Sequence, residues 1–177
     1  MGGACPPAAE ARFVRRLPCT LAHGFLVQIV PFRPDLAPAF SALNRAWIEQ
    51  LFAVEAADLK LLDDPKAAIV DPGGQIFFAL DGETPVGTAA AIKVPPRRFE
   101  LAKMAVAPSH QGRGLGRLLG ETVITWARGQ GAEVVFLLTN SSLNGAIRLY
   151  QRLGFVHRPL PANTDYARAD VYMDLIV

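Results

Sequence analysis

The stretch from Glu100 to Leu119 constrains the fold more than any other segment, because it joins an apolar strand pattern, a glycine-rich turn and an amphipathic helix pattern. Glycines at 112, 114 and 116 let the backbone approach a ligand closely and turn successive N–H groups inward. The helix behind them adds N–H donors that lack helical acceptors, together with the positive end of the helix dipole. Arg113 and Arg117 add positive charge. The segment therefore predicts a binding site for a diphosphate.

Two common phosphate-binding motifs do not fit this turn. A Walker loop ends in Gly-Lys-Ser/Thr, whereas Gly116 is followed by Arg-Leu. A dinucleotide fingerprint needs G-x-G-x-x-G, but the third glycine is missing whether the count starts at Gly112 or at Gly114. The pattern that does fit is Q-x-x-G-x-G, over residues 111–116.

A second informative segment, residues 138–155, reads L-T-N-S-S-L-N-G-A-I-R-L-Y-Q-R-L-G-F. Four of its residues recur at helical spacing and predict one apolar helix face: Ala146, Leu149, Tyr150 and Leu153. Gly154 is the expected stop after this helix, and Asn144 is expected near its start.

Together these segments resemble the core motifs of the GCN5-related N-acetyltransferases (the GNAT superfamily), in which the Q/R-x-x-G-x-G/A loop holds the diphosphate of acetyl-CoA. The finer pattern of residues 139–155 and the tail 166–173 resemble a bacterial branch that occurs alone or fused to MarR-type regulators. One position departs from the common GNAT pattern: Leu143 stands where an Asn usually lies, seven residues before the tyrosine. The resemblance covers residues 25–177.

The patterns along the chain predict the element order β-α-α-β-β-β-α-β-α-β-β, which is that of a GNAT fold. We expect an α/β (α+β) protein with a mixed, mostly antiparallel central sheet of six to seven strands and about four flanking helices. Residues 24–177 are expected to form a single domain, and residues 1–23, which are rich in Ala, Pro, Gly and Arg, a poorly ordered extension.

The bulk composition narrows the class of protein and its partners. With 177 residues, 51% of them hydrophobic and 19% charged, the chain predicts one soluble globular domain. The basic pairs Arg15-Arg16 and Arg97-Arg98 lack interleaved aromatics, and no apolar run is long enough for a membrane span, so we expect neither nucleic acid nor membrane as a partner. Two cysteines in the leader, Cys5 and Cys19, favour the cytoplasm. A homodimer is compatible with the sequence, and no metal-ligand spacing occurs.

Glu100 is the predicted general base. It precedes Gln111 by eleven residues, the spacing found between the base glutamate and the equivalent Gln in the histone-acetylating branch, so the resemblance implies that it deprotonates the substrate ammonium, directly or through water. Such a base needs a pKa raised by partial burial. Strand alternation places one set of residues on the face toward the thioester: Glu100, Ala102, Met104 and Val106. A solvated acid, or an ion-pair partner of a nearby cation, is the alternative.

Tyr150 is the second predicted catalytic residue, since the resemblance implies that its phenol protonates or hydrogen-bonds the departing CoA thiolate; a core aromatic is the alternative. The resemblance also implies that main-chain groups of Met104, Ala105 and Val106 pair with pantetheine and polarise the thioester carbonyl. The predicted acetyl-CoA-binding set is completed by Gln111, Gly112, Arg113, Gly114, Leu115, Gly116, Arg117 and Asn140. Asn140 could equally be a turn residue.

The acceptor side is less constrained. Lys103 lies in an otherwise apolar strand, and a lone buried ammonium is costly, so it is expected to pair with Glu100 or an acid of a neighbouring strand, or to line the acceptor pocket. Acidic residues of the region 47–62 and just beyond are expected to form a solvated helical face, with attraction of a cationic substrate as the alternative: Glu49, Glu55, Asp58, Asp63 and Asp64.

The sequence thus predicts an N-acetyltransferase that moves the acetyl group of acetyl-CoA directly to a primary amine, expected on a small molecule. No Cys or Ser with a paired base is evident as a nucleophile, in agreement with direct transfer. Two alternatives remain open: a protein (lysine or N-terminal) acetyltransferase, and a non-catalytic acyl-CoA-binding regulator.

Overall fold

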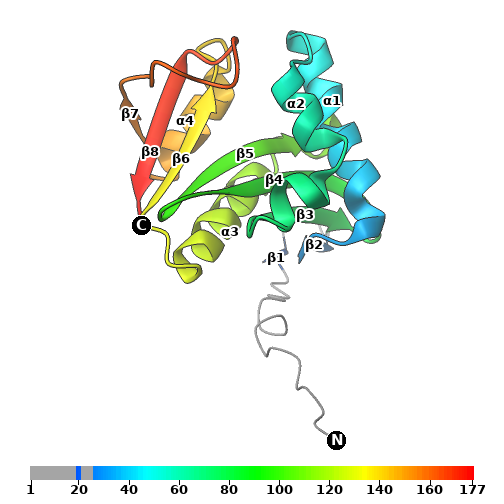
Figure 1. Cartoon of the computed structure of the whole chain (residues 1–177). Coiled ribbons are helices and arrows are strands. Elements are labelled where there is room, and N and C mark those ends of the chain that lie inside the picture. Colours follow the sequence, from blue (N-terminus) through cyan, green and yellow to red (C-terminus); the bar gives the residue numbers. More distant parts are fainter. Residues whose placement is uncertain (1–18, 21–25) are drawn as a thin grey trace, which may run out of the picture.

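The computed structural model describes residues 19–20 and 26–177 (Figure 1). Its elements follow the predicted order. They are β1 (Cys19–Thr20), β2 (Leu26–Pro31), α1 (Ala37–Leu51), α2 (Ala56–Leu62), β3 (Gln75–Asp81), β4 (Thr84–Val94), β5 (Arg98–Val106), α3 (Leu115–Gly129), β6 (Val134–Thr139), α4 (Asn144–Arg152), β7 (Val156–Arg158) and β8 (Val171–Ile176). A short π-helical turn, Lys66–Val70, precedes β3.

One mixed sheet runs through the molecule in the strand order β1-β2-β3-β4-β5-β6-β8-β7. Every neighbouring pair is antiparallel except β5 and β6, which are parallel. The predicted mixed, mostly antiparallel sheet is confirmed. The structure adds one strand that was not predicted, β1, which has two residues. β1 lies within the stretch predicted as a poorly ordered extension; the remainder of residues 1–23 lies outside the described part of the chain.

Helices cover both faces of the sheet (Figure 1). On one face α3 and α4 close a core that includes Phe99, Leu101 and Leu119. On the other face α1, α2 and the π-helical turn close a second core around Phe40 and Phe78. Strand β3 is buried on both faces from Ile76 to Leu80, which explains why its sequence is a continuous apolar run rather than an alternating one.

Strands β5 and β6 separate soon after they start. They pair only where Arg98–Glu100 lies opposite Val134–Phe136. Beyond that point β5 continues to Val106 and β6 to Thr139, and Figure 1 shows the two strands diverging into a V. The backbone edge of β5 that faces β6 is therefore unpaired with it over most of the strand.

A β-bulge in β5 changes which side chains share a face. The register with β4 shifts between Ala90, opposite Ala102, and Thr88, opposite Ala105, and Lys103 has the left-handed φ of 50°. The extra residue reverses the alternation of side chains along β5. Leu101 and Met104, three residues apart, therefore both pack in the core beneath α3, whereas in a regular strand they would lie on opposite faces. The prediction that Glu100, Ala102, Met104 and Val106 share one face is therefore wrong.

Glu100 and Ala102 instead lie on the face covered by α1 and α2. Their partners in β4 are Ile92 and Ala90, and both of these belong to the core beneath α1 and α2.

Among the described helices, none is long and apolar enough to cross a membrane.

Candidate active site

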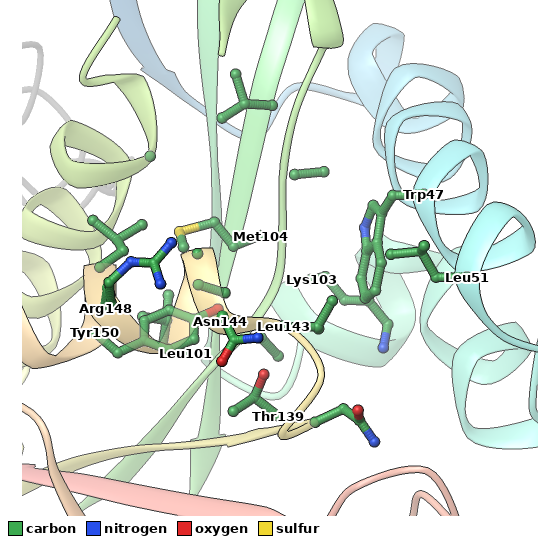
Figure 2. Close-up of a pocket in the computed structure, with 18 of the residues that line it drawn as sticks. Trp47, Leu51, Leu101, Lys103, Met104, Thr139, Leu143, Asn144, Arg148 and Tyr150 are labelled. Atoms are coloured by element: carbon green, nitrogen blue, oxygen red, sulfur yellow. The ribbon is translucent and has the colours of Figure 1, made fainter. Parts of the chain in front are cut away.

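A cavity of about 1030 Å³ lies where β5 and β6 separate (Figure 2). One end is lined by the glycine turn after β5 and by α4, including Gly114 and Tyr150. The other end is lined by the last turn of α1 and by the segment before β8, including Trp47 and Arg168. Glu100 and Lys103 line the cavity from β5. The cavity thus brings both predicted catalytic residues and the predicted diphosphate turn into one space.

The glycine turn has the geometry expected of an anion cradle. Gly112 and Gly114 have φ of 73° and 82°, values that a side chain would strain, and a Cβ at either would meet no atom within 4 Å. Leu118 donates to the Gly114 carbonyl at 3.0 Å as the first helical bond of α3. The N–H groups of the three residues before Leu118 therefore have no helical acceptor and point out of the helix start.

Side chains around the turn fix its shape and add charge. Gln111 Nε2 donates to the carbonyl oxygen of Val106 at 2.9 Å and so ties the turn to the end of β5. Arg117 lines the cavity and pairs with Glu121 one helical turn later at 2.7 Å. Arg113 is exposed and does not line the cavity. Free N–H donors, the helix dipole and Arg117 fit a diphosphate.

Glu100 has the properties of a general base. Burial raises the pKa of Glu100 from 4.5 to about 7, with a smaller lowering by Lys103 and a smaller raising by Asp165. Within the described part of the chain, no hydrogen bond or ion pair of its carboxylate is found. A half-buried carboxylate of this kind is available to a ligand and accepts a proton near neutral pH.

Tyr150 lies on α4 at the end of the cavity that the glycine turn lines (Figure 2). Its ring packs edge-to-face on Phe155, with 6.1 Å between ring centroids. Burial raises the pKa of Tyr150 to about 12, so the phenol carries its proton at neutral pH. Among the described residues its hydroxyl makes no hydrogen bond. The ring is thus held by packing while the hydroxyl is left for a ligand.

The strand edge and Asn140 complete the predicted set. Met104, Ala105 and Val106 line the cavity on the edge that β6 leaves unpaired. Asn140 also lines it, but its amide donates to the Arg168 carbonyl at 2.6 Å and accepts from the Ser142 N–H at 2.9 Å. Asn140 therefore shapes the loop, and its contact with CoA stays a prediction.

A buried charge cluster, which was not predicted, lies at the end of the cavity lined by Trp47 and Arg168. We call this end the acceptor end, because the acceptor is expected there. Asp58 of α2 is fully buried and accepts from Arg168 through both carboxylate oxygens at 2.7 Å. Lys103 donates to Asp58 at 2.9 Å and to the Tyr166 hydroxyl at 2.8 Å. Glu55 accepts from Arg168 at 3.0 Å. We define Glu55, Asp58, Lys103, Tyr166 and Arg168 as the acceptor-end cluster.

Two expectations are corrected by this cluster. Glu55 and Asp58 do not lie on a solvated helical face, and Lys103 pairs with an acid of helix α2 rather than with an acid of a strand. Burial raises the pKa of Asp58, but the hydrogen bonds from Arg168, from the Glu55 backbone and from Lys103 outweigh it and lower that pKa to about 2. The lone lysine in an apolar strand was the signal that a buried acid must exist; only the fold identifies which one.

Comparison with known proteins identifies the family and agrees with the fold. Residues 37–155 match the model of the acetyltransferase (GNAT) family. The chain belongs to this family. Its further placement in the branch related to MarR-type regulators stays a prediction.

Two curated relatives illustrate the range of similar proteins. Rat N-acetyltransferase 8B is 36% identical over 100 residues, which is 54% of this chain and 45% of the relative. The N-alpha-acetyltransferase RimI of Mycobacterium tuberculosis is 32% identical over 123 residues, which is 64% of this chain and 75% of that protein. The chain thus spans less than half the length of the rat relative.

Solved structures share the fold at low sequence identity. A GNAT acetyltransferase from Staphylococcus aureus superposes with a TM-score of 0.76 at 18% identity, covering 84% of this chain and 97% of that one. A Bacillus subtilis acetyltransferase in complex with CoA superposes with a TM-score of 0.62 at 19% identity, covering 85% and 97%.

Proposed function

We propose that this protein is an N-acetyltransferase that transfers the acetyl group of acetyl-CoA directly to a primary amine of a small molecule. The observation that carries the proposal is the shared cavity, which joins the glycine turn to Glu100 and Tyr150 across the splayed strands. Acetyl-CoA would place its diphosphate on the N–H groups of residues 112–117 and its pantetheine along the free edge of β5. The CoA-bound Bacillus relative supports this choice of donor.

Glu100 and Tyr150 then each have a defined task in the transfer. Glu100 takes a proton from the ammonium, and the free amine attacks the thioester carbonyl. An N–C bond forms, the C–S bond breaks, and Tyr150 gives its proton to the departing thiolate. The nitrogen loses its second proton as it becomes an amide, that proton returns to the Tyr150 phenolate, and Glu100 releases its proton to solvent. Holding both reactants in one cavity removes the entropy cost of a bimolecular encounter.

A protein acceptor is the second candidate. RimI is named an N-alpha-acetyltransferase, and Leu51, which lines the acceptor end of the cavity, is 54% exposed. A polypeptide amine could enter there.

We further propose a cytoplasmic location, in keeping with the two cysteines near the N-terminus, Cys5 and Cys19.

The test is release of free CoA from acetyl-CoA in the presence of a panel of amines and of peptides with free N-termini. We expect turnover with small amines above turnover with peptides. Binding of acetyl-CoA by calorimetry without turnover on any amine or peptide would contradict the proposal and would favour a non-catalytic acyl-CoA binder.

A further inference from the structure

The acceptor end of the cavity has an apolar wall built by the end of α1. Trp47, Leu51 and Phe52 line it, and the rings of Trp47 and Phe52 meet edge-to-face with 6.4 Å between centroids. Leu51 is 54% exposed. Figure 2 shows Trp47 and Leu51 on the α1 side of the cavity, facing Lys103. A flat apolar group placed on this wall would leave water and gain the contact energy of an aromatic surface.

Within the part of the chain that the structure describes, the cations of the acceptor-end cluster are already paired. Its two cations, Lys103 and Arg168, are matched by Asp58 and Glu55 in the acceptor-end cluster. Both terminal nitrogens of Arg168 already donate to these carboxylates. If either cation moved to bind a ligand, the fully buried carboxylate of Asp58 would lose a counter-charge, which is energetically costly.

Two further acids of the described residues add negative charge near the expected position of the amine. Asp165 lies close enough to Glu100 to raise the pKa of its carboxyl, and Glu100 is itself negative in the base form that receives the acceptor's proton. A carboxylate next to the acceptor amine would meet these two acids, because the cations of the acceptor-end cluster are already neutralised. An ammonium group would be attracted to the same place.

We propose that the acceptor is a primary amine with a flat apolar substituent and with no carboxylate beside the amino group. The substituent lies against Trp47 and Leu51, and the amine lies at Glu100. This inference rests on the proposed function and names the substrate class of that same site.

The test compares four probes by their kcat/KM for CoA release: phenethylamine, phenylalaninamide, phenylalanine and ethylamine. We expect kcat/KM for phenethylamine and for phenylalaninamide to exceed that for phenylalanine and for ethylamine by tenfold or more. Phenylalaninamide matches phenylalanine in size and lacks its negative charge, so it separates charge from bulk. Because the amide also lowers the pKa of the amino group, kcat/KM is compared per concentration of free amine. Phenylalanine at parity with its amide, or ethylamine at parity with phenethylamine, would overturn the inference.

Two variants locate the substituent. Trp47→Ala should lower kcat/KM for phenethylamine about tenfold and change that for ethylamine less than twofold. Leu51→Ser, at a more exposed position, should act in the same direction and keeps the test valid if Trp47→Ala does not fold. Leu59→Ala is the matched control, because Leu59 is an exposed apolar residue of α2 outside the cavity lining; it should leave both probes unchanged.

The outcomes separate the inference from the proposed function. If no amine releases CoA, the proposed function fails and the inference with it. If amines release CoA without regard to ring or carboxylate, or if Leu59→Ala matches Trp47→Ala, the inference alone fails.

Discussion

Replacing Glu100 with Gln should remove the rising limb of the pH–rate profile. The wild-type carboxyl has a pKa of about 7, so its base form, and with it kcat/KM, should rise about tenfold per pH unit below that value and level off above it. The amide cannot accept the proton. Initial rates between pH 5.5 and 9 measure this, with acetyl-CoA affinity as the control, which should hardly change. An unchanged limb in the variant would assign the base to another residue.

The same substitution should stabilise the protein at alkaline pH. The folded-state pKa of Glu100 is raised from 4.5 to about 7, so folding penalises the ionised form and wild-type stability falls as pH rises through this window. Glu100→Gln should therefore exceed the wild type in free energy of unfolding by roughly 1–3 kcal/mol more at pH 8 than at pH 4. Urea unfolding at both pH values tests this; a difference independent of pH would mean that Glu100 is solvated.

Tyr150→Phe should depress turnover and leave stability nearly unchanged. The ring keeps its packing on Phe155, and only the hydroxyl, which makes no hydrogen bond among the described residues, is lost. Removing a general acid costs a factor of about 10² to 10⁴ in rate. The loss should shrink with an acetyl donor whose thiol is more acidic. A variant with lowered Tm and wild-type kcat would make Tyr150 a structural residue.

At the scale of elements, the start of α3 is expected to be the diphosphate site. Gly114→Asp adds a side chain at a φ of 82° and a negative charge beside the phosphates, so acetyl-CoA binding should fall below detection by calorimetry. Gly129→Asp, at the other end of α3 and outside the cavity, is the control and should bind normally. Equal affinities in the two variants would rule out the cradle.

The packing of α2 against β5 and the segment before β8 depends on Asp58. Asp58→Ala leaves Lys103, 8% exposed, without its buried counter-charge and should lower the free energy of unfolding by about 3–5 kcal/mol. Asp63→Ala, which removes an exposed pair with Arg45, should cost less than about 1 kcal/mol. Similar losses in the two variants, measured by urea unfolding, would contradict a structural role for the acceptor-end cluster.

For the whole molecule, the element order and the glycine turn could be read from periodicity and glycine placement, because both depend on local pattern. The face of the sheet on which Glu100 lies could not be predicted, because the bulge that sets it is formed at Lys103, and lysine has no preference for the positive φ found there. The burial of Asp58 could not either: a short helix with an acid three residues after Glu55 looks the same whether it faces solvent or a buried lysine. Long-range packing decides both cases.

The proposed function requires that donor and acceptor meet between the splayed strands β5 and β6. A crystal structure of the protein with CoA would show where the donor binds. We predict the diphosphate within hydrogen-bond distance of the N–H groups of residues 112–117, the pantetheine along the free edge of β5, and the sulfur facing the Tyr150 hydroxyl. CoA bound outside this cavity, or bound with its sulfur remote from both Tyr150 and Glu100, would contradict the account.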